Sequence, residues 1–202
     1  ILKRCGAQRS RTRKQPMSTA ARLCGSEFDS MVLRGAFDGL DPMKIELLHG
    51  ELRFMNPAGP VHEGEVEYLT DWSYQNTNRQ QISIRVQSSF NCGDHRPEPD
   101  LLWFRKQSSK RIRPNQSDVL LAIEVADSSL TQDLGEKASL YAEHGIVEYW
   151  VVDIAGEQVY VHRAPSQGCY QSITHHGPPA LISPLCQPLA NLKLAPLFDL
   201  EN

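Results

Sequence analysis

The 202-residue chain lacks the features that mark several familiar functional classes. No apolar run approaches the roughly 18 residues needed to cross a bilayer, which excludes a membrane-spanning protein. No glycine-rich phosphate loop follows any apolar run, which argues against the common nucleotide-binding folds. The Gly-x-Ser-x-Gly motif of nucleophilic serine hydrolases is also missing. Internal repeats and low-complexity blocks are absent after residue 16, so the remaining chain is expected to fold as an ordinary globular domain.

Cysteine is scarce and scattered. Five cysteines stand at positions 5, 24, 92, 169 and 186, and none forms a Cys-x-x-Cys pair. An odd number at wide spacings favours reduced thiols and a cytoplasmic location over a disulfide framework. The pattern Cys92-x-x-His95 supplies only half of a zinc site, so structural zinc is not expected.

Acidic residues are missing from positions 1–16, which hold six basic residues. The rest of the chain carries 15 basic and 24 acidic residues, a net charge of −9. Residues 1–16 are expected to be a disordered basic head, either a dispensable tail or a flexible arm attracted to phosphates. Residues 17–202 are expected to form one domain, since a domain takes roughly 100–200 residues. The charge of this domain argues against simple duplex binding, which usually uses a basic surface.

The apolar pattern predicts an α/β (α+β) fold with a mixed central sheet. Helices are expected over residues 26–37, 62–78 and 133–144. The last of these would start at a capping box formed by Asp133 and Glu136, and it would stop at Gly145. Strands are expected over residues 45–48, 51–55, 82–90, 100–104, 119–125, 147–152, 158–162 and 170–174.

Two carboxylates interrupt apolar strands, and these positions are where chemistry is expected. Glu124 follows the run Val119–Ile123, and Asp100 begins the run that continues to Phe104. A buried carboxylate needs a cation, strong donors or a proton, because burying it ionised and unpaired costs several kcal/mol. If the two strands are neighbours, a divalent cation would relieve the repulsion between these acids. The alternative is that both acids are solvated at strand ends, or that Glu124 pairs with a lysine.

Lys137 supports the first interpretation. It falls in the first turn of the predicted helix, where a positive charge opposes the helix dipole. An ion pair with Asp133 would give it a modest structural role. Alternatively, its ammonium reaches back over the strand end and stabilises charge beside the metal.

The stretches around these residues resemble one family. They are residues 98–102 (EPDLL), 123–129 (IEVADSS), 133–153 (DLGEKASLYAEHGIVEYWVVD) and the upstream block 46–62. This set is similar to the Uma-two-type putative restriction endonucleases, within the PD-(D/E)XK nuclease superfamily. The resemblance covers approximately residues 18–200, and the run 133–153 is its most specific part.

The resemblance implies the restriction-endonuclease-like fold and the hydrolysis of DNA phosphodiester bonds with Mg²⁺ or Mn²⁺. Position by position, it implies Asp100 and Glu124 as metal-binding catalytic acids and the backbone carbonyl of Val125 as a further ligand. The superfamily's lysine normally stands two residues after the second acid, where this chain has Ala126. The resemblance therefore implies that Lys137, from the following helix, is the catalytic lysine.

Four more residues fall at recurrent or neighbouring positions and are expected to support the site. Glu51 would complete the acidic cluster, and His62 would support the acids or touch DNA. Gln87 matches a family position, and Tyr141 lies one helical turn after Lys137 on the same face.

Two other functions remain open from the sequence. One is a catalytically silent, nuclease-like module that binds or regulates, which would show no metal binding. The other is a metal-dependent phosphoesterase that acts on RNA or nucleotides, which a comparison of substrates would reveal. For a DNA endonuclease with one site per chain, cleavage of both strands would favour a homodimer.

Overall fold

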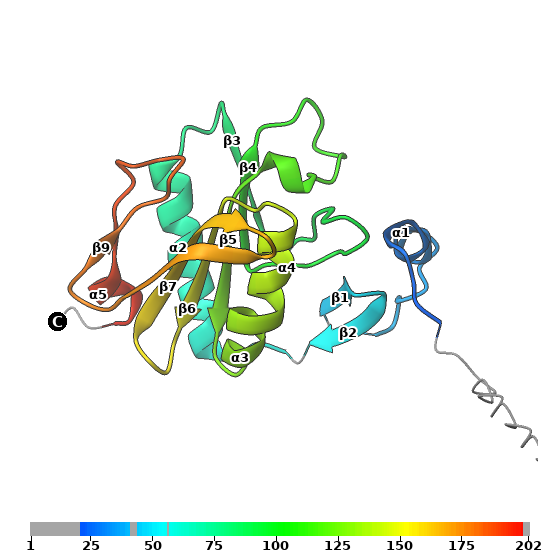
Figure 1. Cartoon of the computed structure of the whole chain (residues 1–202), viewed down its shortest axis with the longest axis horizontal. Helices are drawn as coiled ribbons and strands as arrows, with labels where there is room; N and C mark the ends of the chain where they lie inside the picture. Colours follow the sequence, from blue (N-terminus) through cyan, green and yellow to red (C-terminus); the bar gives the residue numbers. More distant parts are fainter. Residues whose placement is uncertain (1–20, 41–43, 56, 200–202) are drawn as a thin grey trace, which may run out of the picture.

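A six-stranded mixed sheet forms the centre of the protein in a computed structural model that describes residues 21–40, 44–55 and 57–199 (Figure 1). The strand order is β3-β4-β5-β6-β7-β8, and only the β5–β6 pair is parallel. The strands are β3 (Ile82–Val86), β4 (Leu101–Arg105), β5 (Val119–Ala126), β6 (Glu148–Asp153), β7 (Gln158–Ser166) and β8 (Cys169–His176). The predicted α/β fold with a mixed central sheet is therefore confirmed.

Helices cover both faces of this sheet. On one face α2 (Pro60–Asn76) packs beside the C-terminal segments β9 (Leu181–Ile182), β10 (Leu192–Lys193) and α5 (Leu194–Leu197). Its Trp72 stacks on Trp103 and Trp150, with ring centroids 5.2 and 6.0 Å apart, and all three tryptophans are buried in the core. Within the described residues no helix is long and apolar enough to cross a membrane.

The other face is covered by the connection between the parallel strands. It is one continuous helical stretch, made of α3 (Leu130–Gln132), the π-helical turn η2 (Asp133–Lys137) and α4 (Ala138–Glu143). The helix ends as predicted before Gly145, which has a φ of 73°. Glycine adopts this left-handed conformation without the steric penalty that a side chain would bring.

The predicted capping box at the start of this helix is wrong. The helix begins three residues earlier, at Leu130, so Asp133 lies inside it and is not its N-cap. The Asp133 carboxylate accepts a hydrogen bond from the Ser129 hydroxyl, and the Glu136 carboxylate lies near Arg53, 3.4 Å away. Of the two residues that resembled a cap, Asp133 is therefore held by a local contact and Glu136 by the hairpin.

Two other boundaries differ from those predicted. Strand β3 ends at Val86 because Gln87 adopts a φ of 44° and donates its amide to the Asp100 carbonyl. The first helix, α1 (Gly25–Leu33), stops before Gly35, whose φ is 69°. The short elements β9, β10 and α5 fall in a proline-rich tail for which the sequence predicted no regular structure. The basic head, residues 1–16, lies outside the described residues.

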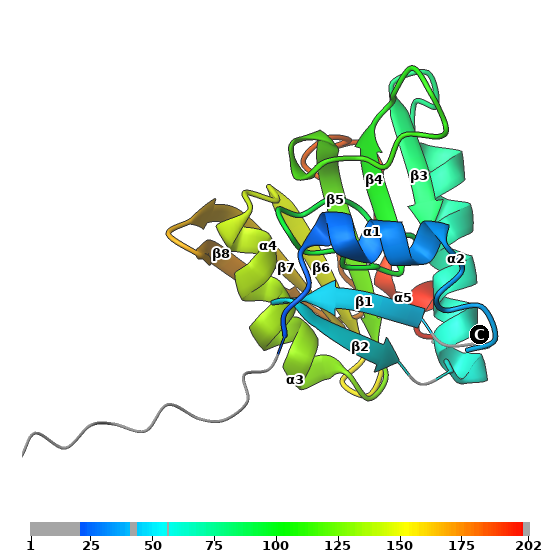
Figure 2. The same ribbon diagram turned by 90° about the vertical axis from the view of Figure 1, so that its right-hand side faces the viewer.

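A separate hairpin lies beside the main sheet, next to α1 (Figure 2). It consists of β1 (Lys44–Leu48) and β2 (Glu51–Met55), two predicted strands that His49 and Gly50 join. Leu48 is fully buried in the core on the α4 side, and Leu47 exchanges two backbone hydrogen bonds with Arg96. The hairpin is thus fixed to the loop that leads into β4.

Three histidine side chains form further contacts between the hairpin, this loop and α4. The His95 ring packs against His49 of the hairpin turn and His144 at the end of α4, with centroids 4.9 and 5.2 Å apart. The His95 Nδ1 accepts the His49 amide at 2.9 Å, so it is unprotonated in this arrangement. Burial and the charges of His49 and His144 lower the pKa of His95, and the nearby acids Glu143 and Asp94 do not outweigh them.

This contact predicts acid-sensitive stability. A histidine with a lowered folded pKa contributes stability that is present above its ordinary pKa of about 6.5 and lost as the pH falls through the folded value. We expect urea-unfolding midpoints to fall between about pH 7 and pH 5, and to fall less in His95→Asn, whose amide oxygen can accept the same hydrogen bond. The exposed His175→Asn is the matched control. Equal pH slopes for parent and His95→Asn would contradict the assignment.

Candidate active site

Two of the predicted acids meet where β4 and β5 pair. Leu101 pairs with Ile123 in the antiparallel register, and Asp100 and Glu124 are the next residue along each strand. Both side chains are buried, with 3% and 4% of their surface exposed. The sheet therefore brings together two carboxylates that are 24 positions apart in the chain.

Asp100 is held by groups from three other elements. Its Oδ1 accepts Lys44 Nζ at 2.7 Å, while its Oδ2 accepts the Val125 amide at 2.9 Å and lies 3.2 Å from His62 Nε2. Burial opposes ionisation of this carboxyl, but the His62 hydrogen bond and the Lys44 charge outweigh it. The pKa of Asp100 is therefore held well below its ordinary value, and the group is an anion at neutral pH.

Glu124 faces the helix on the opposite side of the strand pair from α2. Its Oε1 accepts Lys137 Nζ at 2.9 Å and the Tyr141 hydroxyl at 3.1 Å. Burial raises the pKa of Glu124, the Lys137 charge opposes that rise, and Asp133 and Asp100 add to it. Glu124 therefore holds its proton more readily than Asp100 does.

Lys137 is almost fully enclosed, with 1% of its surface exposed. Its Nζ lies 2.9 Å from Glu124, 3.2 Å from Glu46 and 3.8 Å from Asp133. Burial disfavours the ammonium, but these carboxylates outweigh it and raise the pKa of Lys137 above its ordinary value. The lysine therefore stays charged among the acids, nearer to Glu124 and Glu46 than to Asp133, its alternative partner in the sequence analysis.

Glu46 belongs to this cluster, and the sequence reasoning missed it. It lies on β1 with 1% of its surface exposed, and its Oε1 accepts the Glu98 amide at 2.6 Å. Its Oε2 is buried and has no hydrogen-bond partner within the described part of the chain. The signal was available, because Glu46 interrupts the apolar run Ile45–Leu48 just as Glu124 interrupts its own strand.

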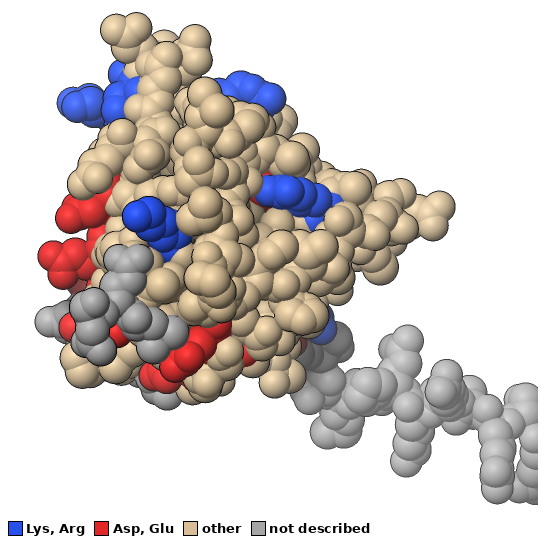
Figure 3. Space-filling model, turned by 90° about the vertical axis from the view of Figure 1, so that its left-hand side faces the viewer, with Lys and Arg blue, Asp and Glu red and all other residues tan. Residues whose placement is uncertain are grey.

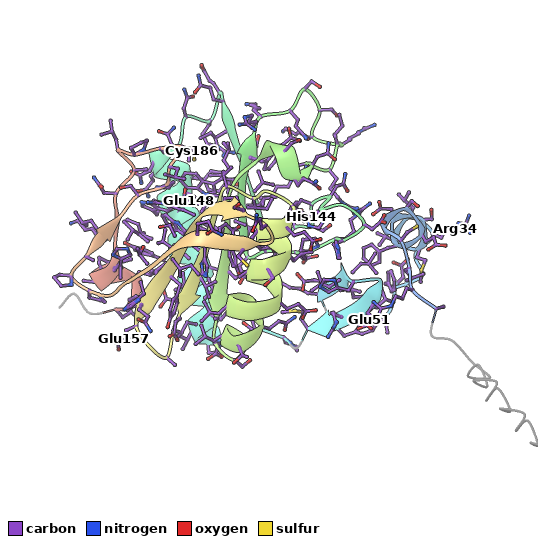
Figure 4. The ribbon with its side chains drawn as sticks, viewed as in Figure 1. Arg34, Glu51, His144, Glu148, Glu157 and Cys186 are labelled. Carbon is purple, nitrogen blue, oxygen red and sulfur yellow. The ribbon has the colours of Figure 1, made fainter. Side chains whose placement is uncertain are left out.

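Two predicted supporting residues lie elsewhere. Glu51 is exposed on the hairpin (Figure 4), and its carboxylate lies 3.1 Å from Arg53 and 3.5 Å from Arg22. It makes no ion pair with Lys137, whose partners are Glu124, Glu46 and Asp133. Glu51 shares a face of the hairpin with Glu46 and Arg53, but it pairs with Leu48 beside the turn, where the arginines hold its carboxylate. The Gln87 side chain is exposed, and only its backbone amide reaches Asp100.

The π-helical turn positions the lysine. Asp133 and Lys137 are the first and last residues of η2, and both side chains are buried. The Tyr149 hydroxyl donates to the Asp133 carbonyl at 3.2 Å, which fixes the turn to β6. Single π-helical turns within α-helices are frequent at functional sites.

The donor set matches a hard divalent cation in kind. Four buried carboxyls, those of Glu46, Asp100, Glu124 and Asp133, share the ammonium groups of Lys44 and Lys137, so carboxyl oxygens outnumber the cations beside them. The orphaned Glu46 Oε2 is an oxygen donor of the type that Mg²⁺ and Mn²⁺ prefer. In this arrangement no three His, Cys, Asp or Glu side chains of the described residues converge as metal ligands do. Instead, the carboxylate oxygens are paired with the ammonium groups of Lys44 and Lys137.

Comparisons with known proteins point to nucleases. A family model described as "Uma2: Putative restriction endonuclease" matches residues 36–195. The crystal structure of a putative nuclease belonging to DUF820 from Anabaena variabilis ATCC 29413 has the same fold. Its TM-score is 0.67 at 17% identity, and the match covers 88% of this chain and 98% of that one.

One curated relative is similar over part of its length. Ribonuclease Y of Latilactobacillus sakei subsp. sakei (strain 23K) is 28% identical over 111 residues, which make up 54% of this chain. The same stretch is 21% of that protein, so this chain spans about a fifth of its relative's length.

The central position of the lysine predicts a stability effect. Lys137→Met keeps the length of the side chain but leaves Glu124 and Glu46 buried without their cation, which costs about 3–5 kcal/mol of unfolding free energy. Tyr141→Phe removes one hydrogen bond and should cost about 1 kcal/mol. Urea denaturation at neutral pH measures both losses, with the exposed Lys110→Met as the control. Parent-like stability of Lys137→Met would mean that the ammonium does not hold the acids together.

Proposed function

Since the chain belongs to the Uma2 family of putative restriction endonucleases, we propose that it is a metal-dependent endonuclease that hydrolyses phosphodiester bonds in DNA. The observation that carries the proposal is the position of a buried ammonium beside paired carboxylates. Lys137 Nζ lies 2.9 Å from Glu124 on β5. Asp100 lies at the start of the neighbouring strand β4 and accepts a hydrogen bond from the Val125 amide. Acids on neighbouring strands beside a lysine are the groups that phosphodiester hydrolysis uses.

Asp100 and Glu124 would hold Mg²⁺ or Mn²⁺, with the Val125 carbonyl as an oxygen ligand. Glu46 is a further donor, because its Oε2 has no other partner among the described residues. Such a cation polarises a phosphate oxygen and lowers the pKa of a bound water.

The chain's own groups would prepare the site for a phosphate. The hydrogen bond from His62 and the charge of Lys44 keep Asp100 ionised. The Tyr141 hydroxyl orients Glu124, so the carboxylate is fixed before any ligand arrives. The Lys137 ammonium would offset the negative charge that develops on the phosphoryl oxygens.

Charge distribution suggests which side meets the nucleic acid. On the face opposite the hairpin, basic residues are scattered and acidic residues gather along one side (Figure 3). On the hairpin side, Lys44 and Arg53 stand next to the acids, with 22% and 40% of their side chains exposed. We therefore propose that DNA approaches from the hairpin side. Two copies of the chain would be needed to cut both strands at once.

This function predicts the effect of removing each acid's charge. Asp100→Asn and Glu124→Gln keep the side-chain shape but weaken cation binding, so we expect metal-dependent DNA cleavage to fall about 100-fold or more. Calorimetry with Mg²⁺ and Mn²⁺ should show weaker binding in both variants. EDTA should stop cleavage by the parent, and either cation should restore it.

Controls separate this proposal from the alternatives. Glu67→Gln removes an exposed acid of α2 and should change neither metal binding nor cleavage. RNA of the same sequence, offered under the same metal condition, tests whether the substrate is DNA. Folded parent protein that binds neither cation, with or without DNA, would refute the catalytic proposal and favour a silent binding module.

A further inference from the structure

A cavity lies beside the acids, between α1, β1 and the loops that flank β4. Its volume is about 340 Å³, which is within the range of small-ligand pockets. One wall is apolar and partly aromatic, formed by Phe28, Val32, Phe37 and Ile45. The two phenylalanine rings lie 5.7 Å apart and are tilted by 37°. A flat apolar group could therefore pack against these rings.

The polar part of the lining is in contact with the active site. Lys44 lines the cavity, and its Nζ is the group that lies 2.7 Å from Asp100. Glu98 also lines it, and the Glu98 amide donates to Glu46. Two members of the cavity wall thus contact two carboxylates of the acidic cluster. A ligand in the cavity would be next to a phosphate at the acids.

Two hydrogen-bonding groups at this rim are available to a ligand. The Glu98 carboxyl and the Ser89 hydroxyl line the cavity, and neither makes a hydrogen bond to another described residue. By contrast, the Arg113 guanidinium, which also lines the cavity, forms an ion pair with Asp29. The cavity therefore combines an aromatic wall with a small number of unpaired polar groups, which is how proteins hold a nucleobase outside its stack.

We propose that this cavity receives one unpaired nucleobase of the nucleotide that flanks the scissile phosphate. The proposal rests on the proposed function, because it takes the acids as the place of cleavage. A paired base is stacked within the duplex and reaches such a cavity only after leaving the stack. The preferred substrate is therefore a single strand, or a duplex with an unpaired nucleotide at the cut.

The fluorescent base 2-aminopurine gives a direct test. Single-stranded oligodeoxynucleotides that carry it at one position, each with and without the complementary strand, are titrated with the full chain. Ca²⁺ is present as an oxygen-binding cation. We expect tighter binding of the single strand, and a fluorescence change that depends on the position of the probe.

Filling the cavity should remove this behaviour. Val32 is 43% exposed on α1, so Val32→Trp extends into the cavity without disturbing the core. We expect at least a tenfold loss of single-strand affinity and loss of the fluorescence change. Leu33→Trp is the matched control, because Leu33 is 87% exposed on the same helix and does not line the cavity. If Val32→Trp unfolds at a lower temperature than the parent, Val32→Met serves in its place. Methionine fills less of the cavity, so it should cause a smaller loss of single-strand affinity.

The outcomes separate this inference from the proposed function. Equal binding by Val32→Trp and the parent, or equal affinity for single strand and duplex, would overturn the base site even if the protein cleaves DNA. The expected binding pattern in a protein that cuts no strand would support the base site and overturn only the proposed function.

Discussion

The site depends on one ammonium that several buried carboxylates share. Lys137 Nζ lies within 3.2 Å of both Glu124 and Glu46, and all three side chains are shielded from water. Each buried ion would cost several kcal/mol by itself. The charges are therefore tolerable only as a set, and the set requires a strand, a hairpin and a helix to be in place together.

The same requirement explains the arrangement of the surrounding elements. Asp100 is bonded to β1 through Lys44, to α2 through His62 and to β5 through the Val125 amide. The hairpin contributes both Lys44 and Glu46, although it lies outside the main sheet. Its anchoring by Leu48, by the backbone of Leu47 and by the histidine contacts is thus part of the construction of the site.

Much of this could be predicted from the sequence, because periodicity and buried charge are local signals. The strands containing Asp100 and Glu124 stood out since a carboxylate interrupts an apolar run. Lys137 stood out because the predicted helix start at Asp133 placed it in the first turn, against the helix dipole. The helix in fact starts at Leu130, so the residue was found although this reason for it was wrong. The family resemblance then gave these residues roles, which the arrangement in space accommodates.

Other parts of the site could not be found in this way. Glu46 and Glu51 lie on the same face of a short hairpin, and only the packing of the hairpin against the helix decides that Glu46, and not Glu51, reaches Lys137. Asp133 resembled an N-cap because residues after Asp133 fit the local capping pattern, whereas the actual start of the helix depends on the preceding loop. The cavity beside the acids combines residues from α1, β1 and distant loops, so no single stretch of sequence reveals it.

The π-helical turn affects how such a site can be recognised in other sequences. A π turn contains one more residue than the α turn it replaces, so a one-residue insertion or deletion can create or remove it. Deleting one residue from this turn would restore an α turn and leave the lysine at the same point in space, one residue closer to Glu124 along the chain. A relative that lacks the insertion must therefore carry its lysine at a different sequence separation to place the ammonium at the same point. The distance between acid and lysine along the chain is, for this reason, a poor alignment landmark.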